Sequence, residues 1–345
     1  MNPMISSQSG VPTSQLVANL STFVKLIIPT SKSIITPYTP EFMDKQTSEW
    51  LLQSDPSVAF QTMRDLLDRP RKQWLAEKEK MLQQGWVKQL LDLQDPSGTW
   101  GSGLYGPKYI STHYTLLLLR RLEMPHTRNI SRACKELIKI DAIGNITTTD
   151  PKRIDACITG MGLSILSHFE VFDHIYDEII EYLEENQMED GGWNCRRPRE
   201  ETTHSSMNTT LSVLEGLREL AIHDHRYISK VKRLRDPAHE FLLSHDLYKS
   251  HTTGKIIHNS FIDISFPPRW KYNILSAMDY FQSIDHLYDD RMADAIQLIK
   301  QRERNGKWPQ GQQLSGKTFF STNISGEGSP FNTLRALRVL RKYPT

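Results

Sequence analysis

Three stretches of the chain repeat one pattern: Gln94–Trp100 (QDPSGTW), Gln187–Trp193 (QMEDGGW) and Gln301–Trp308 (QRERNGKW). In each, an apolar stretch of helical period ends at a glutamine, and a short polar turn then leads to Gly-x-Trp. Three copies after similar amphipathic segments indicate that one supersecondary unit is reused along the chain. The repeat therefore predicts an array of helical hairpins.

A second repeat marks where the more apolar helix of each predicted hairpin begins. Polar residues occupy one aligned position at these starts: Gln61, His113, Cys157, Asn208, Asn273 and Asn332. The intervals between them are long enough for two helices and two loops. The stretches between are apolar on one side only, which is typical of peripheral helices, and they cover residues 72–93, 130–140, 174–187, 237–245 and 291–302.

The sequences of the first and last hairpins indicate whether the hairpins form an open stack or a closed ring. An open stack of hairpins needs polar capping repeats at both ends, yet the first and last units here resemble the middle ones. The sequence therefore predicts an all-α, (α/α)6 toroid over residues 43–345, with the aligned polar residues around a central mouth. Residues 1–42 are rich in Ser, Thr and Pro, and we expect a disordered leader or an over-extended translation start there.

Composition narrows the classes of partner. The chain has 345 residues, of which 38% are hydrophobic, enough for a large core. Lysine and arginine total 42 against 40 acidic residues, so charge gives no reason to expect nucleic acid. An odd number of cysteines suits a reducing compartment, and we expect a cytoplasmic protein. No apolar run reaches about 18 residues, so no transmembrane segment is predicted, although peripheral membrane contact stays open.

The Gln-to-Gly-x-Trp repeat on helical hairpins resembles the QW motif of squalene-hopene and oxidosqualene cyclases. It also resembles the wider α/α toroid superfamily that includes protein prenyltransferase β subunits, over roughly residues 45–342. This resemblance implies that Trp100, Trp193 and Trp308 stack at helix ends and that the glutamines tie neighbouring hairpins together. Squalene-hopene cyclases join two toroids, and this chain has the length for one.

A metal site is implied by the same resemblance. Asp155-Ala-Cys157 is similar to the Asp-x-Cys pair that holds zinc in the prenyltransferases together with a later histidine, and His204 is the candidate here. Carboxylate, thiolate and imidazole suit Zn²⁺. The order differs, because in the prenyltransferases this pair follows the basic Gly-Gly-aromatic segment. The alternative is that Cys157 is a small buried hydrophobe and Asp155 a helix N-cap.

Two basic segments are candidates for binding an anionic head group. GGWNCRR, which ends in Arg196 and Arg197, is similar to the segment whose basic residues hold a prenyl diphosphate in the prenyltransferases. Two prolines also place Arg269 and Trp270 before an inner helix, where a cation beside an aromatic ring can hold an anion over an apolar floor. The alternative there is a proline-initiated helix with Trp270 packed in the rim.

The sequence offers fewer candidates for catalytic residues than for binding residues. His113 shares the lining position and titrates near neutral pH, and His204 and Asp155 complete the set. The Asp-x-Asp-Asp acid of the cyclases is missing from the sequence. The spacing from Asp289 to Asp294 is similar to the magnesium-binding aspartates of class I terpene synthases, but acidic residues at the start of a peripheral helix also complement its dipole.

The leading hypothesis is a single-toroid enzyme of the terpene cyclase or prenyltransferase type, acting on an isoprenoid or similar apolar substrate. Its binding residues would be the mouth side chains Gln61, Asn208, Asn273 and Asn332, with Arg196, Arg197, Arg269 and Trp270. The alternative is a non-catalytic toroid that binds a ligand or protein through the same mouth. A glycan-processing barrel would need two facing carboxylates about 5 to 9.5 Å apart, and the lining positions hold none.

Overall fold

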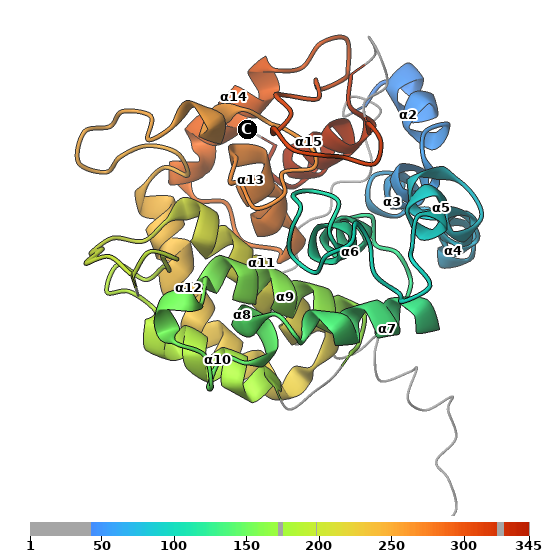
Figure 1. Cartoon of the computed structure of the whole chain (residues 1–345). Helices are drawn as coiled ribbons and strands as arrows, with labels where there is room; N and C mark the ends of the chain where they lie inside the picture. Colours follow the sequence, from blue (N-terminus) through green and yellow to red (C-terminus); the bar gives the residue numbers. More distant parts are fainter. Residues whose placement is uncertain (1–42, 172–174, 198, 323–327, 345) are drawn as a thin grey trace, which may run out of the picture. The chain divides into compact units, whose positions relative to one another are not determined.

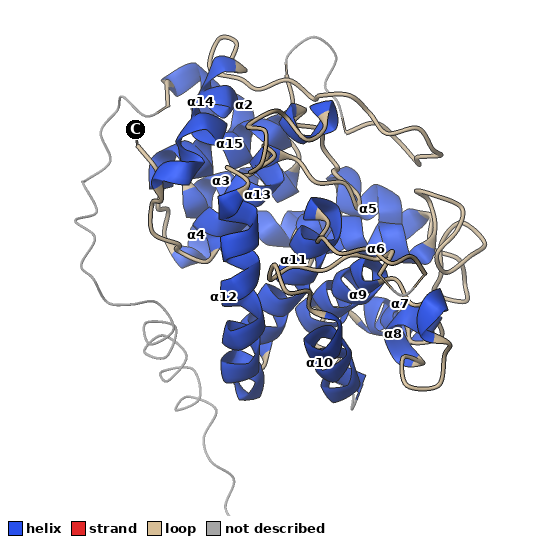
Figure 2. Cartoon of the chain, turned by 90° about the vertical axis from the view of Figure 1, so that its left-hand side faces the viewer, coloured by secondary structure: helices blue, strands red, loops and turns tan. Residues whose placement is uncertain are grey.

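The computed structural model describes residues 43–171, 175–197, 199–322 and 328–344. Across these ranges the regular structure is helical, without a strand, and this confirms the all-α class (Figure 2). The predicted leader, residues 1–42, lies outside the described residues. None of the described helices combines the length and hydropathy needed to cross a bilayer, as the sequence predicts. The cytoplasmic location stays a prediction.

Helices rich in buried residues alternate along the chain with more polar ones. The apolar helices are α3 (Pro56–Asp65), α6 (Thr112–Arg121), α9 (Ala156–His168), α11 (Met207–His223), α13 (Ile274–Ser283) and α15 (Pro330–Lys342). The others are α2 (Lys45–Leu52), α4 (Arg71–Glu79), α5 (Gly85–Asp92), α7 (Arg128–Leu137), α8 (Asp141–Gly144), α10 (Ile175–Asn186), α12 (Ile228–Ser244) and α14 (Ala293–Gln301). Short 3-10 turns are η1 (Lys80–Leu82), η2 (Pro151–Arg153), η3 (His225–Tyr227), η4 (Asn259–Ile262) and η5 (Asp290–Met292).

Packing contacts join α6 to α9, α9 to α11, α13 to α15, and α15 to the first apolar helix, α3 (Figure 1). Five polar contacts also link successive apolar helices or the residues directly after them. They are Arg64 to Glu123 (2.8 Å), His168 to the Met124 carbonyl oxygen (3.2 Å), Arg218 to Ser283 (2.6 Å), Arg335 to Asp279 (2.9 Å) and Arg338 to Gln61 (2.5 Å).

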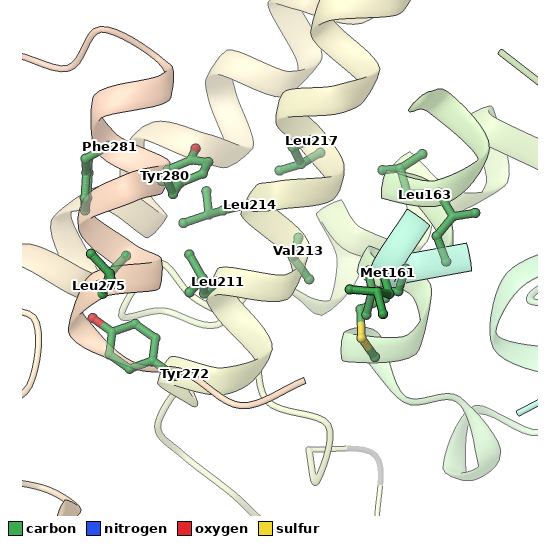
Figure 3. Close-up of a cluster of buried hydrophobic side chains, with 14 of the residues drawn as sticks. Met161, Leu163, Leu211, Val213, Leu214, Leu217, Tyr272, Leu275, Tyr280 and Phe281 are labelled. Carbon is green, nitrogen blue, oxygen red and sulfur yellow. The ribbon is translucent and has the colours of Figure 1, made fainter. Parts of the chain in front are cut away.

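Between α9 and α11, His168 contacts Glu219 at 3.3 Å near the helix ends, and the rest of the junction includes close backbone contact. A Cβ on Gly160 would lie 2.6 Å from Cα of Val213, and one on Gly216 would lie 2.4 Å from the carbonyl oxygen of Gly160. Glycine at both positions therefore lets the helices touch. Figure 3 shows Leu211 and Leu214 between α11 and α13, where they continue this core.

The three repeated tryptophans are buried and make the same two hydrogen bonds. Each indole N–H donates to a carbonyl in the last turn of the preceding polar helix: Leu90 (2.7 Å), Leu183 (2.8 Å) and Ile299 (2.7 Å). Each tryptophan backbone N–H donates to a threonine hydroxyl near the start of the next apolar helix: Thr112 (3.0 Å), Thr210 (3.0 Å) and Thr333 (2.9 Å). These bonds confirm the predicted fastening role.

Two of the repeated glutamines reach the neighbouring hairpin. Gln94 donates to the carbonyl oxygen of Asn129 at 3.5 Å, and Gln187 donates to that of Leu234 at 2.8 Å. Both also donate to a glycine carbonyl within their own turn, Gly98 and Gly191. In these two copies of the repeat the glutamine therefore ties one hairpin to the next, as the resemblance implies.

Three predicted helix bounds were wrong, each for a local reason. The stretch 72–93 is broken into α4, η1 and α5, because Gly85 has φ +78 and its Cα faces the carboxylate of Asp55. Pro237 lies inside α12 and does not begin it. Finally, α3 begins at Pro56 behind its cap Asp55, so Gln61 lies in the middle of that helix and not at its start.

Candidate functional site

A cavity of about 290 Å³ lies between α6 and the loop that precedes α13, under residues 313–322. Its walls combine apolar and polar side chains in about equal measure. The apolar ones are Leu118 from α6 and Pro267, Leu314, Phe319 and Phe320 from the loops, and the polar ones include Thr115, Gln313 and Thr322. Tyr109 supplies a further aromatic wall. Ligand pockets commonly enclose about 300 to 1,000 Å³ and combine such walls with a few polar groups. The cavity is therefore near the lower end of that range.

The charged side chain in this lining is Arg269, which is 8% exposed. Its guanidinium carbon lies 5.0 Å from the ring centroid of Tyr109. Burial, and then the charge of Arg121, lower the pKa of Arg269 to about 10, so it is protonated at neutral pH. No carboxylate pairs with it among the described residues. A buried cation without a counter-ion is costly, and this favours an anionic group beside it.

A hydrogen bond from Arg121 holds the backbone of Arg269 in position. Arg269 has φ +57, and its carbonyl oxygen accepts a hydrogen bond of 2.9 Å from Nη1 of Arg121. Arg121 in turn pairs with Glu215 at 3.1 Å. Trp270 does not line the cavity, and its indole N–H donates to the hydroxyl of Tyr109 at 3.2 Å. This hydrogen bond from Trp270 holds the ring of Tyr109, on which Arg269 stacks.

The residues predicted to surround the central mouth form hydrogen bonds within the protein and do not line the cavity. Gln61 donates to the carbonyl oxygen of Ser57 at 2.8 Å. Asn208 accepts from the backbone N–H of Tyr272 at 2.8 Å, and Asn273 caps α13 by accepting from Ser276 at 2.8 Å. Asn332 donates to the carbonyl oxygen of Pro309 at 2.8 Å. These amides cap helices or hold loops in place. Their position in the sequence alone does not tell such a role from that of a residue that lines a cavity.

The basic segment after Trp193 is also away from the cavity. Arg196 and Arg197 are exposed, and the guanidinium of Arg196 lies 3.8 Å from the carboxylate of Glu200. His204 is exposed too, and its backbone carbonyl accepts from Asn194 at 2.9 Å. Of the predicted binding residues, Arg269 is therefore the one that the structure places in the lining.

The predicted zinc ligands do not converge. Asp155 forms an ion pair with Arg199, and the backbone N–H of Cys157 donates to Sγ of Cys195 at 3.2 Å. The described part of the chain brings together one set of three metal-ligand side chains, and Asp155, Cys157 and His204 are not in it. Their spacing matches a motif, but the carboxylate of Asp155 is paired with Arg199, and the three side chains do not meet.

The aspartates that are similar to a magnesium motif pair with cations. Asp289 caps η5 and lies 2.8 Å from the guanidinium of Arg291, and Asp294 pairs with Lys249. Acidic residues at a helix start often serve in this way. These contacts support the structural interpretation of the two aspartates.

His113 is fully buried, and neither ring nitrogen has a hydrogen-bond partner among the described residues. Its ring lies 5.3 Å from those of Tyr105 and Tyr114. Burial lowers the pKa of His113 to about 3, so the ring is neutral at physiological pH. It is not part of the cavity lining.

A cluster of buried charges behind the cavity was not predicted. Arg120 and Arg121 end α6 and lie 3.5 and 3.1 Å from the carboxylate of Glu215 on α11. Burial alone would raise the pKa of Glu215, but these arginines outweigh it and lower the pKa to about 2. The signal in the sequence was an Arg-Arg pair directly after four leucines in an otherwise buried helix.

Comparison with known proteins gives no relative from which a role can be transferred. No family model matches the chain, and neither the curated proteins nor the solved structures contain a match. The geometry of the cavity is therefore the basis for any functional conclusion.

Proposed function

We propose that this chain is a closed (α/α)6 toroid that binds a small apolar molecule with an anionic head group. The observation that carries the proposal is Arg269, a buried cation that lines a partly apolar cavity of about 290 Å³. An arginine presents a planar fork of donors that suits carboxylate and phosphate. The apolar walls then suit the remainder of such a ligand.

The closed toroid is supported by contacts between the two ends of the described array. The hydroxyl of Thr47 donates to the carbonyl oxygen of Gly306 at 3.4 Å, and Nζ of Lys307 lies 4.3 Å from the ring centroid of Trp50. On the inner helices, Arg338 of α15 pairs with Gln61 and Asp65 of α3. These contacts are what closure of the repeat requires.

An isoprenoid or similar apolar molecule is the ligand class that the resemblance to cyclases and prenyltransferases implies. A prenyl diphosphate combines an apolar chain with an anionic head, and Arg269 and the walls around Leu118 match these two parts. The small volume favours a short chain. We therefore propose a prenyl diphosphate of few isoprene units as the first ligand to test.

Binding without catalysis is the version that the cavity favours. Its described lining contains no aspartate, glutamate, histidine or cysteine. A cyclase of the squalene-hopene type needs an acid in its cavity, and a prenyltransferase-like site needs a metal set. A terpene cyclase or prenyltransferase-type enzyme remains the second candidate, and it rests on the resemblance of the repeats.

The test is calorimetric titration of the full chain with prenyl diphosphates of increasing length. We expect saturable binding, weakened at least about tenfold in Arg269→Gln, because a hydrogen bond to a charged group is worth about 1.5 to 3 kcal/mol. The matched control is Arg196→Gln, which removes an exposed arginine and should bind as the wild type does. No binding, or equal weakening in both variants, would refute the proposal. Product formation with Mg²⁺ or Zn²⁺ would favour the enzyme.

A further inference from the structure

Two imidazoles and a carboxylate meet where α9 and α11 end. His168 is the last residue of α9, and Glu219 and His223 lie one turn apart at the end of α11. One ligand atom from each lies within 4.8 Å of the other two. None of the three lines the cavity, so this site is separate from the proposed ligand site.

Each histidine has an acceptor at its outer nitrogen. Nε2 of His168 lies 3.2 Å from the carbonyl oxygen of Met124, and Nδ1 of His223 lies 3.5 Å from the carboxylate of Glu170. Oxygens of these kinds accept hydrogen bonds, so each outer nitrogen can keep a proton while the inner nitrogen of a neutral ring binds an ion.

Both inner nitrogens face the same oxygen. Nδ1 of His168 lies 3.3 Å from Oε2 of Glu219, and Nε2 of His223 lies 3.8 Å from it. A carboxylate oxygen only accepts, so without an ion Nδ1 of His168 carries the proton of this contact. A divalent ion would displace that proton and lie between the two nitrogens and the oxygen. The other oxygen of Glu219 is held by Arg218 at 2.5 Å, which leaves Oε2 directed at the histidines.

We propose that His168, Glu219 and His223 bind a divalent transition-metal ion of the zinc class. Two imidazoles and one carboxylate are a common ligand set for Zn²⁺ sites that keep a fourth position open. The outer contacts match the usual second shell, in which a carbonyl or carboxylate fixes the ring of a ligating histidine. The side chains of His168 and His223 are 14% and 22% exposed, which gives an ion a way in.

The test is zinc binding to the metal-free full chain, measured by competition with a chromophoric chelator and by the visible spectrum of the Co²⁺ form. We expect one equivalent to bind to the wild type. Glu170→Gln changes the outer contact alone, and should weaken binding by about 10 to 100-fold, the usual effect of losing a second-shell partner. His223→Gln removes a ligand and should weaken it further. If His223→Gln does not fold, Glu170→Gln decides the question alone.

Controls separate this site from other histidines. Nδ1 of His251 lies 3.1 Å from Nε2 of His245, so this pair is a second meeting of two histidine nitrogens among the described residues. His251→Gln and the exposed His225→Gln should both bind zinc as the wild type does. A wild type that binds no zinc, unchanged affinity in both His223→Gln and Glu170→Gln, or loss of binding in His251→Gln would overturn the proposal.

Discussion

The guanidinium of Arg121 donates a hydrogen bond of 2.9 Å to the backbone carbonyl oxygen of Arg269. This bond connects the buried charges behind α6 to the residue that lines the cavity. Arg121 also neutralises Glu215 at 3.1 Å, so it stabilises the fold and positions the proposed ligand-binding arginine at once.

Arg121→Met should lower the free energy of unfolding by about 3 kcal/mol, because removal of one partner leaves Glu215 largely buried with a weaker counter-charge. It should also weaken ligand binding by releasing the backbone of Arg269. Urea unfolding and calorimetry measure the two effects. Arg233→Met is the control: Arg233 and Glu184 are 65% and 51% exposed in their pair, and an exposed pair of this kind contributes little. Equal losses in both variants would contradict the prediction.

Gly160→Ala should destabilise the protein although alanine is the better helix former. The added methyl would lie 2.6 Å from Cα of Val213, a backbone atom that cannot turn aside. Overpacking of this kind costs about 1 to 3 kcal/mol, more than the gain in helix propensity of about 1 kcal/mol. Urea unfolding measures the difference. A methyl on Gly106 meets open space, so Gly106→Ala should have little effect; a stabilised Gly160→Ala variant would show that α9 and α11 are further apart.

Thr210→Val should cost about 1 to 3 kcal/mol, because the buried backbone N–H of Trp193 loses its acceptor while the side-chain shape is kept. Thr112→Val and Thr333→Val should cost similar amounts, since their hydroxyls serve the other two tryptophans. Thermal or urea unfolding compares the three. The exposed Thr203 is the control, and its change to valine should be nearly neutral. Widely different losses would mean that the three fasteners are not equivalent.

His113 should make stability depend on pH. Burial lowers the pKa of His113 from 6.5 to about 3, so between these values the unfolded chain binds a proton that the folded chain does not. Its contribution is complete above about pH 6.5 and is lost as the pH falls towards 3. His113→Phe should reduce the slope of unfolding free energy by about 1.4 kcal/mol per pH unit in this window. Urea unfolding at several pH values tests this; parallel pH curves for wild type and variant would contradict it.

The features that the sequence predicted well depend on local patterns. Helical period and three copies of Gly-x-Trp specify helix type and the fastening role, because both arise from neighbours in the chain. The wrong start of α3 was also local: Asp55-Pro56 is a cap followed by proline, and it outweighs the alignment of Gln61 with the later repeats.

The sites were harder to predict, because they depend on residues from distant hairpins. Pro267-Pro268 indicated that Arg269 stands before a helix, but not that Arg121 from α6 would hold it. From its motif, Arg196 looked as good a candidate for anion binding as Arg269, but it is exposed to solvent. His168 and His223 have no shared motif in the sequence, since Glu219 joins them through the packing of α9 on α11.

The bond between Arg338 and Gln61 joins positions 277 residues apart. During synthesis, α3 leaves the ribosome long before α15 exists to cover it, and domains of this size fold while exposed apolar surface favours aggregation. The early hairpins must therefore persist as an incomplete array until the last helix arrives. A chain that stops before α15 would lose one helix and also leave an apolar side of α3 uncovered. We thus expect C-terminal truncation to be more harmful than the short length of α15 suggests.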